Sequence, residues 1–207
     1  MRYYLNYSLP VIQQAIWLWF ILALVALPLT WWGSRHLATR ALMRRLGRTS
    51  IGLFYATGVV AYTLLPLPDR DTFVCPAGWG NTYPRFFLGW SLQFALREHG
   101  SLLEALFSTY ILQMLLNILL FIPFGIFAYL FWKAHFRTVL LAAFGVSLVI
   151  ELTQLTGLWG YYGCAIRTFD AEDLFNNTLG AVLGWTFVAA WQCRGYLLET
   201  LKRLFAR

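Results

Sequence analysis

Long apolar runs, separated by shorter polar segments, recur along the whole chain. A helix needs about 20 mostly apolar residues to cross about 30 Å of hydrocarbon. The pattern therefore predicts transmembrane helices at about residues 11–32, 49–66, 108–132, 138–157 and 174–192. The predicted fold is an all-α, polytopic membrane helix bundle of about five transmembrane helices, built as a single membrane domain over residues 1–207.

The composition supports this interpretation and excludes a soluble domain. Of the 207 residues, 59% are hydrophobic and only 12% are charged, whereas soluble domains are about half apolar and about a quarter charged. The mean hydropathy is +0.60. The same values exclude a disordered chain, and 3 cysteines are too few for a disulfide scaffold.

The basic residues predict the orientation of the bundle, because short cytoplasmic loops carry an excess of Lys and Arg. Most of the 16 basic residues are expected on the inner side, namely Arg35, Arg40, Arg44, Arg45, Arg48, Lys133, Arg137, Arg194, Lys202, Arg203 and Arg207. The other five are expected on the outer side, namely Arg2, Arg70, Arg85, Arg97 and Arg167. The N-terminus is then outside, the C-terminus inside, and residues 67–107 form an extracytoplasmic segment. Since the charge is sorted by membrane side, the expected partners are membrane lipids and not nucleic acid.

The extracytoplasmic segment divides into two parts. Residues 67–85 contain several Pro and Gly residues and predict irregular chain. Residues 86–98 carry aromatic residues at near-helical spacing, which predicts a short helix in the membrane interface that ends at Gly100. Ser101 and Glu104 form a capping box that starts the next helix. This segment is either a structural lid or a platform that contacts lipid or a ligand.

Two of the cysteines fall on the same predicted side of the membrane. Cys75 lies in the extracytoplasmic segment and Cys164 lies between the fourth and fifth spans, while Cys193 falls near the inner face. An oxidising outer compartment permits a disulfide between Cys75 and Cys164. We state this pairing as a hypothesis, since the sequence does not give the distance between them.

Polar residues inside the last three spans are the main functional signal. An ionised carboxylate at the bilayer centre costs at least about 2.5 kcal/mol, so it faces protein or water. The helical rise places the candidates in or beside the outer half of the membrane. They are Asn117, Glu151, Gln154, Arg167, Asp170, Asp173 and Asn177. They form either one polar pocket open to the outside or a buried network that holds three helices together.

Structural roles are available for several residues of this region. Asp170 can N-cap the last helix, and Asp173 favours the dipole of that helix. Glu172 is expected to point to solvent. A small-residue motif and a predicted kink favour close helix packing, at Gly180 and Gly184 for the motif and at Pro123 and Gly125 for the kink.

The motifs of the last three spans resemble those of the VanZ-like family. The resemblance covers about residues 109–190 and rests on Asn117-Ile-Leu-Leu-Phe-Ile-Pro123-Phe-Gly125, Glu151-x-x-Gln154 and Arg167-x-x-Asp170-x-x-Asp173-x-x-x-Asn177-x-x-Gly180-x-x-x-Gly184. The resemblance implies a multi-pass protein of the bacterial cytoplasmic membrane. It also implies an association with resistance to teicoplanin-type glycopeptide antibiotics, although many relatives lie outside resistance clusters.

Three functions are consistent with these residues. The first is binding or transport of an amphiphilic envelope molecule, such as a lipid-linked precursor, a lipid headgroup or a lipoglycopeptide, with Arg167 meeting a phosphate or carboxylate. The second is an intramembrane enzyme in which Glu151 is the general acid or base and Asp170 and Asp173 hold a divalent cation. The third is a structural or partner-binding subunit. The absence of a His in the set and of HExxH or G-x-S-x-G motifs weighs against the enzyme, and no other cofactor is expected.

Overall fold

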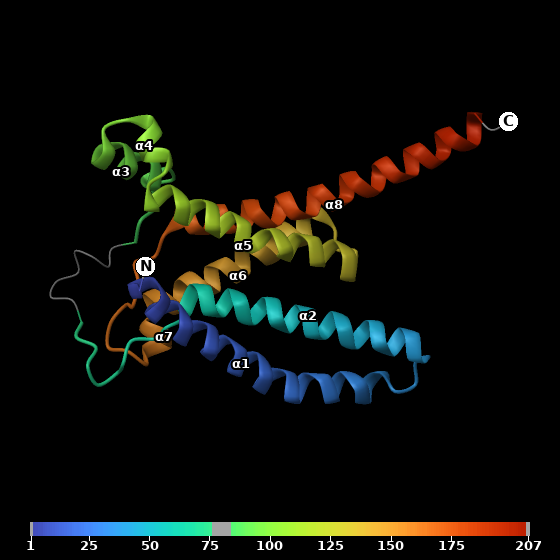
Figure 1. The fold of residues 1–207 in the computed structure, drawn as a ribbon, viewed down its shortest axis with the longest axis horizontal. Coiled ribbons are helices and arrows are strands. Elements are labelled where there is room, and N and C mark those ends of the chain that lie inside the picture. The colour runs from blue at the N-terminus through green and yellow to red at the C-terminus, as the bar shows by residue number, and fades with distance from the viewer. Residues whose placement is uncertain (1, 76–83, 206–207) are drawn as a thin grey trace. The chain divides into compact units, whose positions relative to one another are not determined.

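The computed structural model describes residues 2–75 and 84–205, and within these residues the chain is helical with one isolated β-bridge. Figure 1 shows the helices in chain order. The predicted all-α class is confirmed for the described residues. The chain forms two compact units, Met1–Phe73 and Val74–Arg207, and the single membrane domain over residues 1–207 stays a prediction.

The first unit is a pair of helices, α1 (Arg2–Ser34) and α2 (Thr39–Leu64), which run side by side (Figure 1). Ala23 and Val59 are buried, and the rings of Trp19 and Phe54 meet edge to face at 6.4 Å. Most of the large apolar side chains of α1 are exposed, as expected of a helix whose surroundings are lipid.

The helix α2 begins about ten residues before the predicted span that it contains. The predicted span begins near residue 49 and follows a loop with five arginines, whereas α2 begins at Thr39 and contains four of these, Arg40, Arg44, Arg45 and Arg48. This stretch consists largely of Ala, Leu, Met and Arg, which are strong helix formers. The helix therefore continues past the apolar segment, and the connection to α1 is short.

The second unit is built around α5 (Thr109–Trp132), α6 (Phe136–Leu155) and α8 (Ala171–Phe205). Figure 1 shows these helices packed together, with α8 extending beyond them. Their buried apolar side chains include Phe121, Val139, Ala143 and Ala181. Pro123 lies inside α5, which continues as a single helix on both sides of it.

Glycines bring the main chains of α5 and α8 together. A Cβ atom added to Gly180 would overlap the carbonyl oxygen of Ile118, and one added to Gly184 would overlap that of Ile122. From the other side, a Cβ at Gly125 would overlap the main chain of α8. This contact agrees with the close packing that the small-residue motif predicts.

Three helical segments of the described residues are long and apolar enough to cross a membrane. They are Val11–Ser34, Leu102–Trp132 and Phe136–Leu155, and they coincide with the first, third and fourth predicted spans. The other two predicted spans overlap α2 and α8, which have 26 and 35 residues but a more polar composition. Spans in these two helices, and the orientation of the bundle, stay predictions.

The segment between α2 and α5 contains the short helices α3 (Trp90–His99) and α4 (Leu102–Leu106) beside the start of α5 (Figure 1). The prediction of a helix from residue 86 is wrong at its start, since left-handed Gly89 precedes the first turn of α3. Gly100 ends α3 with a φ of 68°, as predicted. The Ser101 side chain accepts a hydrogen bond from the Glu104 N–H and caps α4, so the predicted helix start is confirmed.

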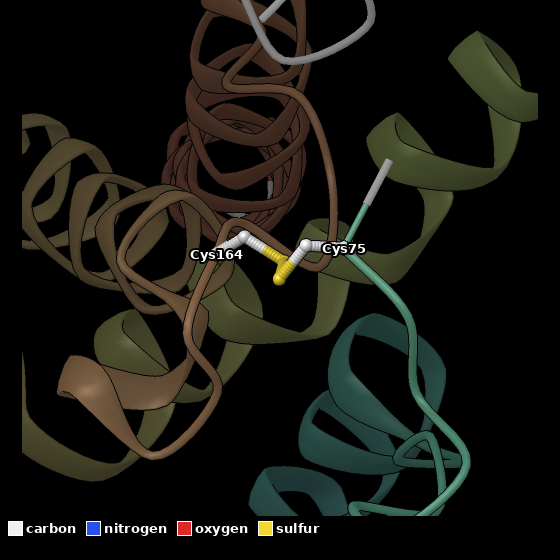
Figure 2. Close-up of a disulfide and its surroundings, with 2 residues drawn as sticks. All are labelled: Cys75 and Cys164. Atoms are coloured by element: carbon white, nitrogen blue, oxygen red, sulfur yellow. A yellow bond between two sulfur atoms is a disulfide. The ribbon is translucent and has the colours of Figure 1, made fainter. Parts of the chain in front are cut away.

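A disulfide joins two distant parts of the second unit. Cys75 is bonded to Cys164 in the loop that follows α6 and the short turn α7 (Gly157–Gly160), as Figure 2 shows. Cys193 is free and exposed. The bond agrees with the hypothesis that Cys75 and Cys164 are paired. The irregular chain predicted for 67–85 falls partly outside the described residues, at 76–83.

Gly184→Ala is expected to destabilise the protein by about 1–3 kcal/mol, because the added methyl group forces the closely packed helices apart. The matched change Gly145→Ala on α6 has open space and should stabilise its helix by about 0.5–1 kcal/mol. Thermal unfolding of both variants in detergent measures the two effects. Equal midpoints would contradict the close contact of α5 and α8.

Replacing both Cys75 and Cys164 by Ser is expected to lower the free energy of unfolding by about 2–4 kcal/mol, because the unfolded chain loses its cross-link. The same change at Cys193, the free cysteine, is the control. The intact protein should also bind no alkylating reagent at residues 75 and 164 after denaturation without reductant. Labelling of both thiols under these conditions would contradict the bond.

Candidate functional site

The predicted site residues converge where α8 begins. The Asp170 side chain caps this helix, with Oδ1 accepting a hydrogen bond from the Glu172 N–H at 3.0 Å, as the sequence suggests. The main-chain N–H of Asp170 donates to Oε2 of Glu151 at 2.8 Å. Glu151, in α6, is only 2% exposed. The buried carboxylate of Glu151 in α6 therefore holds Asp170, the residue that precedes α8.

Arg85 belongs to this site, although its sequence position did not suggest it. Its main chain forms the isolated bridge, donating to Phe169 O and accepting from Ala171 N at 2.8 Å each. Its Nε lies 3.6 Å from Oδ2 of Asp170. Burial raises the pKa of Asp170, and the Glu172 N–H and the charge of Arg85 oppose that rise. No spacing in the sequence links two residues this far apart.

Glu172 does not point to solvent, which corrects the sequence-based expectation. It is 5% exposed and accepts hydrogen bonds from the N–H groups of Gly89 and Ser91 at 3.1 and 3.0 Å. The Ser91 hydroxyl donates to it at 2.6 Å. These donors are at the start of α3, where orphan N–H groups and the helix dipole favour an anion. Glu172 thus ties α3 to α8.

The remaining amides connect α8 to its two neighbours. Asn117, in α5, donates to Oδ1 of Asp173. Asn177 donates to the hydroxyl of Ser147, in α6, at 2.8 Å. Ser147 is fully buried and was missed, because a serine in an apolar helix is unremarkable without its partner. Asp173 and Asn177 of α8 therefore meet partners on two different helices.

Unsatisfied polar atoms remain close to these contacts. Among the residues that the structure describes, the side-chain oxygen of Asn177 and the side-chain nitrogen of Asn176 are buried without a hydrogen-bond partner. Buried amide atoms normally find a partner. The residues predicted from the sequence include Asn177 but not its neighbour Asn176.

Two predicted residues lie at the edge of the arrangement. Gln154 is buried, and its main-chain oxygen accepts from the Ile166 N–H at 3.0 Å. Arg167 is exposed in the loop leading to Asp170. The ion pair that the structure shows here is formed by Arg85 and not by Arg167.

We call the assembled residues the polar cluster: Arg85, Asn117, Ser147, Glu151, Asp170, Glu172, Asp173 and Asn177. The cluster contains the carboxylates of Glu151, Asp170, Glu172 and Asp173 but only the guanidinium group of Arg85. It is therefore suited to accept hydrogen bonds from N–H and O–H donors. Asp170 and Asp173 are the residues that would hold a divalent cation in the enzyme hypothesis. Within residues 2–75 and 84–205, no group of three or more His, Cys, Asp or Glu residues is arranged to hold a metal ion.

Comparison with known proteins supplies one match. A family model described as VanZ/LLP1 matches residues 14–192. The match extends well before residue 109, where the sequence motifs begin, and so includes both units of the structure. No curated protein and no solved structure matches the chain.

Glu172→Ala is expected to destabilise the protein by about 2 kcal/mol, because the N–H groups at the start of α3 lose their buried acceptor. Hydrogen exchange in the segment around Gly89 and Ser91 should become faster. Glu104→Ala, which removes an exposed acidic side chain, is the control and should leave this exchange unchanged. Equal exchange in both variants would show that Glu172 does not hold α3.

Proposed function

The chain belongs to the VanZ/LLP1 family, and we propose that this membrane protein binds or moves an amphiphilic molecule of the bacterial cell envelope. The polar cluster is its binding site in this proposal. The molecule presents a polar headgroup to the cluster while its apolar part stays in the membrane. Family membership supports the membrane setting, and the hydrogen-bonding capacity of the cluster supports the binding of a headgroup.

The observation that carries the proposal is the excess of carboxylates over guanidinium groups at a largely buried place. Glu151 accepts a main-chain hydrogen bond through one oxygen, and Asp173 accepts one from Asn117. A carboxylate offers about four acceptor positions, so both groups can accept further donors. Buried carboxylates that lack counter-charges are costly. An amine or sugar hydroxyl of a ligand would stabilise them.

The arginines suggest a second feature of the headgroup. Arg167 is exposed three residues before Asp170, and the Arg85 side chain is 38% exposed beside Asp170. A guanidinium group binds phosphate or carboxylate through paired hydrogen bonds. The proposed ligand therefore combines an anionic group with hydrogen-bond donors. Phospholipids, lipid-linked cell-wall precursors and lipoglycopeptides share this chemistry, and the last class would link the protein to glycopeptide resistance.

The same contacts favour binding over metal-assisted catalysis by the carboxylates. Asp170 uses Oδ1 to cap α8 and Oδ2 to pair with Arg85. Its oxygens are thus engaged in contacts that a metal ion would have to replace. Glu151 supports the same helix start through Asp170.

Arg167→Ala is expected to weaken headgroup binding about ten- to a hundredfold, since a charge-assisted hydrogen bond contributes about 1.5–3 kcal/mol. Arg137→Ala, an exposed arginine at the opposite end of α6, is the matched control. Binding is measured on purified protein in nanodiscs with three labelled probes, phosphatidylethanolamine, a lipid-linked cell-wall precursor and teicoplanin. The three titrations separate the possible sources of the headgroup.

Unchanged affinity of Arg167→Ala for every probe would overturn the proposed site. A fall of the same extent in both arginine variants would also overturn it, because it would show a general effect of charge. If Arg167→Ala weakens the binding of one probe alone, that probe identifies the class of molecule that the cluster recognises.

A further inference from the structure

Four side chains with oxygen atoms lie where α6 and α8 pack together. On α6, Ser147 and Glu151 are one helical turn apart. On α8, Asp173 and Asn177 are likewise one turn apart. Asn177 Nδ2 donates to Ser147 Oγ at 2.8 Å, and Asp173 lies near enough to Glu151 for the two charges to interact. We call these four residues the oxygen set.

The amide oxygen of Asn177 is the atom of the oxygen set that lacks a partner. Asn177 is 3% exposed, and its Oδ1 is buried without a hydrogen bond to any of the residues that the structure describes. Because its Nδ2 donates to Ser147 of α6, the amide group lies between α8 and α6. A buried amide oxygen costs free energy unless a donor or a cation binds it. An unused acceptor therefore lies about one turn, roughly 5 Å along the helices, from the two carboxylates.

The carboxylates of the oxygen set also lack a positive partner in contact with them. Glu151 receives the neutral main-chain N–H of Asp170, while the Arg85 guanidinium group is paired with Asp170 itself. The charge of Asp173 acts on Glu151 more strongly than the opposing charge of Arg167. Buried charges are normally paired, because their desolvation is costly. The missing partner is therefore positive and binds oxygen.

We infer that the oxygen set binds a singly charged alkali cation between α6 and α8. Hard cations take oxygen ligands, among them carboxylates and the amide oxygen of Asn. Two carboxylates with one amide and one hydroxyl oxygen suit a single charge. A divalent or transition metal is disfavoured, since no three His, Cys, Asp or Glu residues of 2–75 and 84–205 are arranged to hold one. The inference goes beyond the proposed function and does not rest on it, because the cation needs no envelope molecule.

Thermal unfolding of the full-length protein in an uncharged detergent tests this inference. The protein is purified in choline chloride, and sodium or potassium chloride then replaces the choline at constant ionic strength. The unfolding midpoint should rise and level off, by about 5–10 °C when the cation reaches about a hundred times its dissociation constant. Constant ionic strength removes general screening as a cause, and the two series show which alkali ion fits.

Asn177→Ala removes the unpartnered oxygen and should abolish most of this shift. Asn176→Ala is the matched control, because Asn176 is also 3% exposed but its unpartnered atom is the nitrogen Nδ2, so the shift should remain. Asn177→Asp keeps an oxygen and adds a negative charge. The cation concentration that gives half of the shift should then fall about tenfold.

Direct binding of radioactive sodium and potassium-rubidium tracer to the wild-type protein, read by scintillation proximity, decides the question if Asn177→Ala does not fold. A midpoint that rises no more in alkali chloride than in choline chloride would overturn the inference, as would a shift lost equally in both alanine variants. A midpoint that responds to protons or calcium but not to alkali ions would have the same consequence. None of these measurements contains an envelope molecule, so their outcome is separate from that of the headgroup titrations.

Discussion

The close approach of α5 and α8 is the constraint on which the second unit depends. Gly125, Gly180 and Gly184 let the two main chains meet where any side chain would overlap a carbonyl oxygen or a backbone nitrogen. This contact sets the distance between Asn117 and Asp173, which are joined at the end of the same helix pair. In lipid, where apolar burial does not drive helix association, such packing carries much of the specificity.

The acidic residues of the polar cluster also join helices to one another. Glu151 holds the main chain at the start of α8, and Glu172 holds the start of α3. Both receive N–H donors that a helix start leaves without partners. The proposed ligand would therefore contact residues that also fix the geometry of the bundle. A headgroup that stabilises the cluster charges would at the same time stabilise the packing of α3, α6 and α8.

The outcome of the sequence analysis differs between local and long-range features. The helix stop at Gly100 and the caps at Ser101 and Asp170 depend on residues a few positions apart, and the structure has them as predicted. The helix α2 starts before the predicted span because arginine is a strong helix former as well as a topology signal. Glu172 was assigned to solvent because its donors lie more than eighty residues earlier in the chain.

The sequence by itself determined that the protein is helical and surrounded by lipid. It also indicated which polar residues lie where burial in the membrane costs free energy. Periodicity and composition carry this information because they reflect the helix repeat and the solvent. Only the tertiary structure decided how those polar residues are used. It paired Asp170 with Arg85, placed Ser147 against Asn177 and set Gly184 against the main chain of Ile122. Each of these contacts joins segments that are remote in the chain, and a hydrogen bond or a close packing contact between such segments leaves no spacing pattern in the sequence.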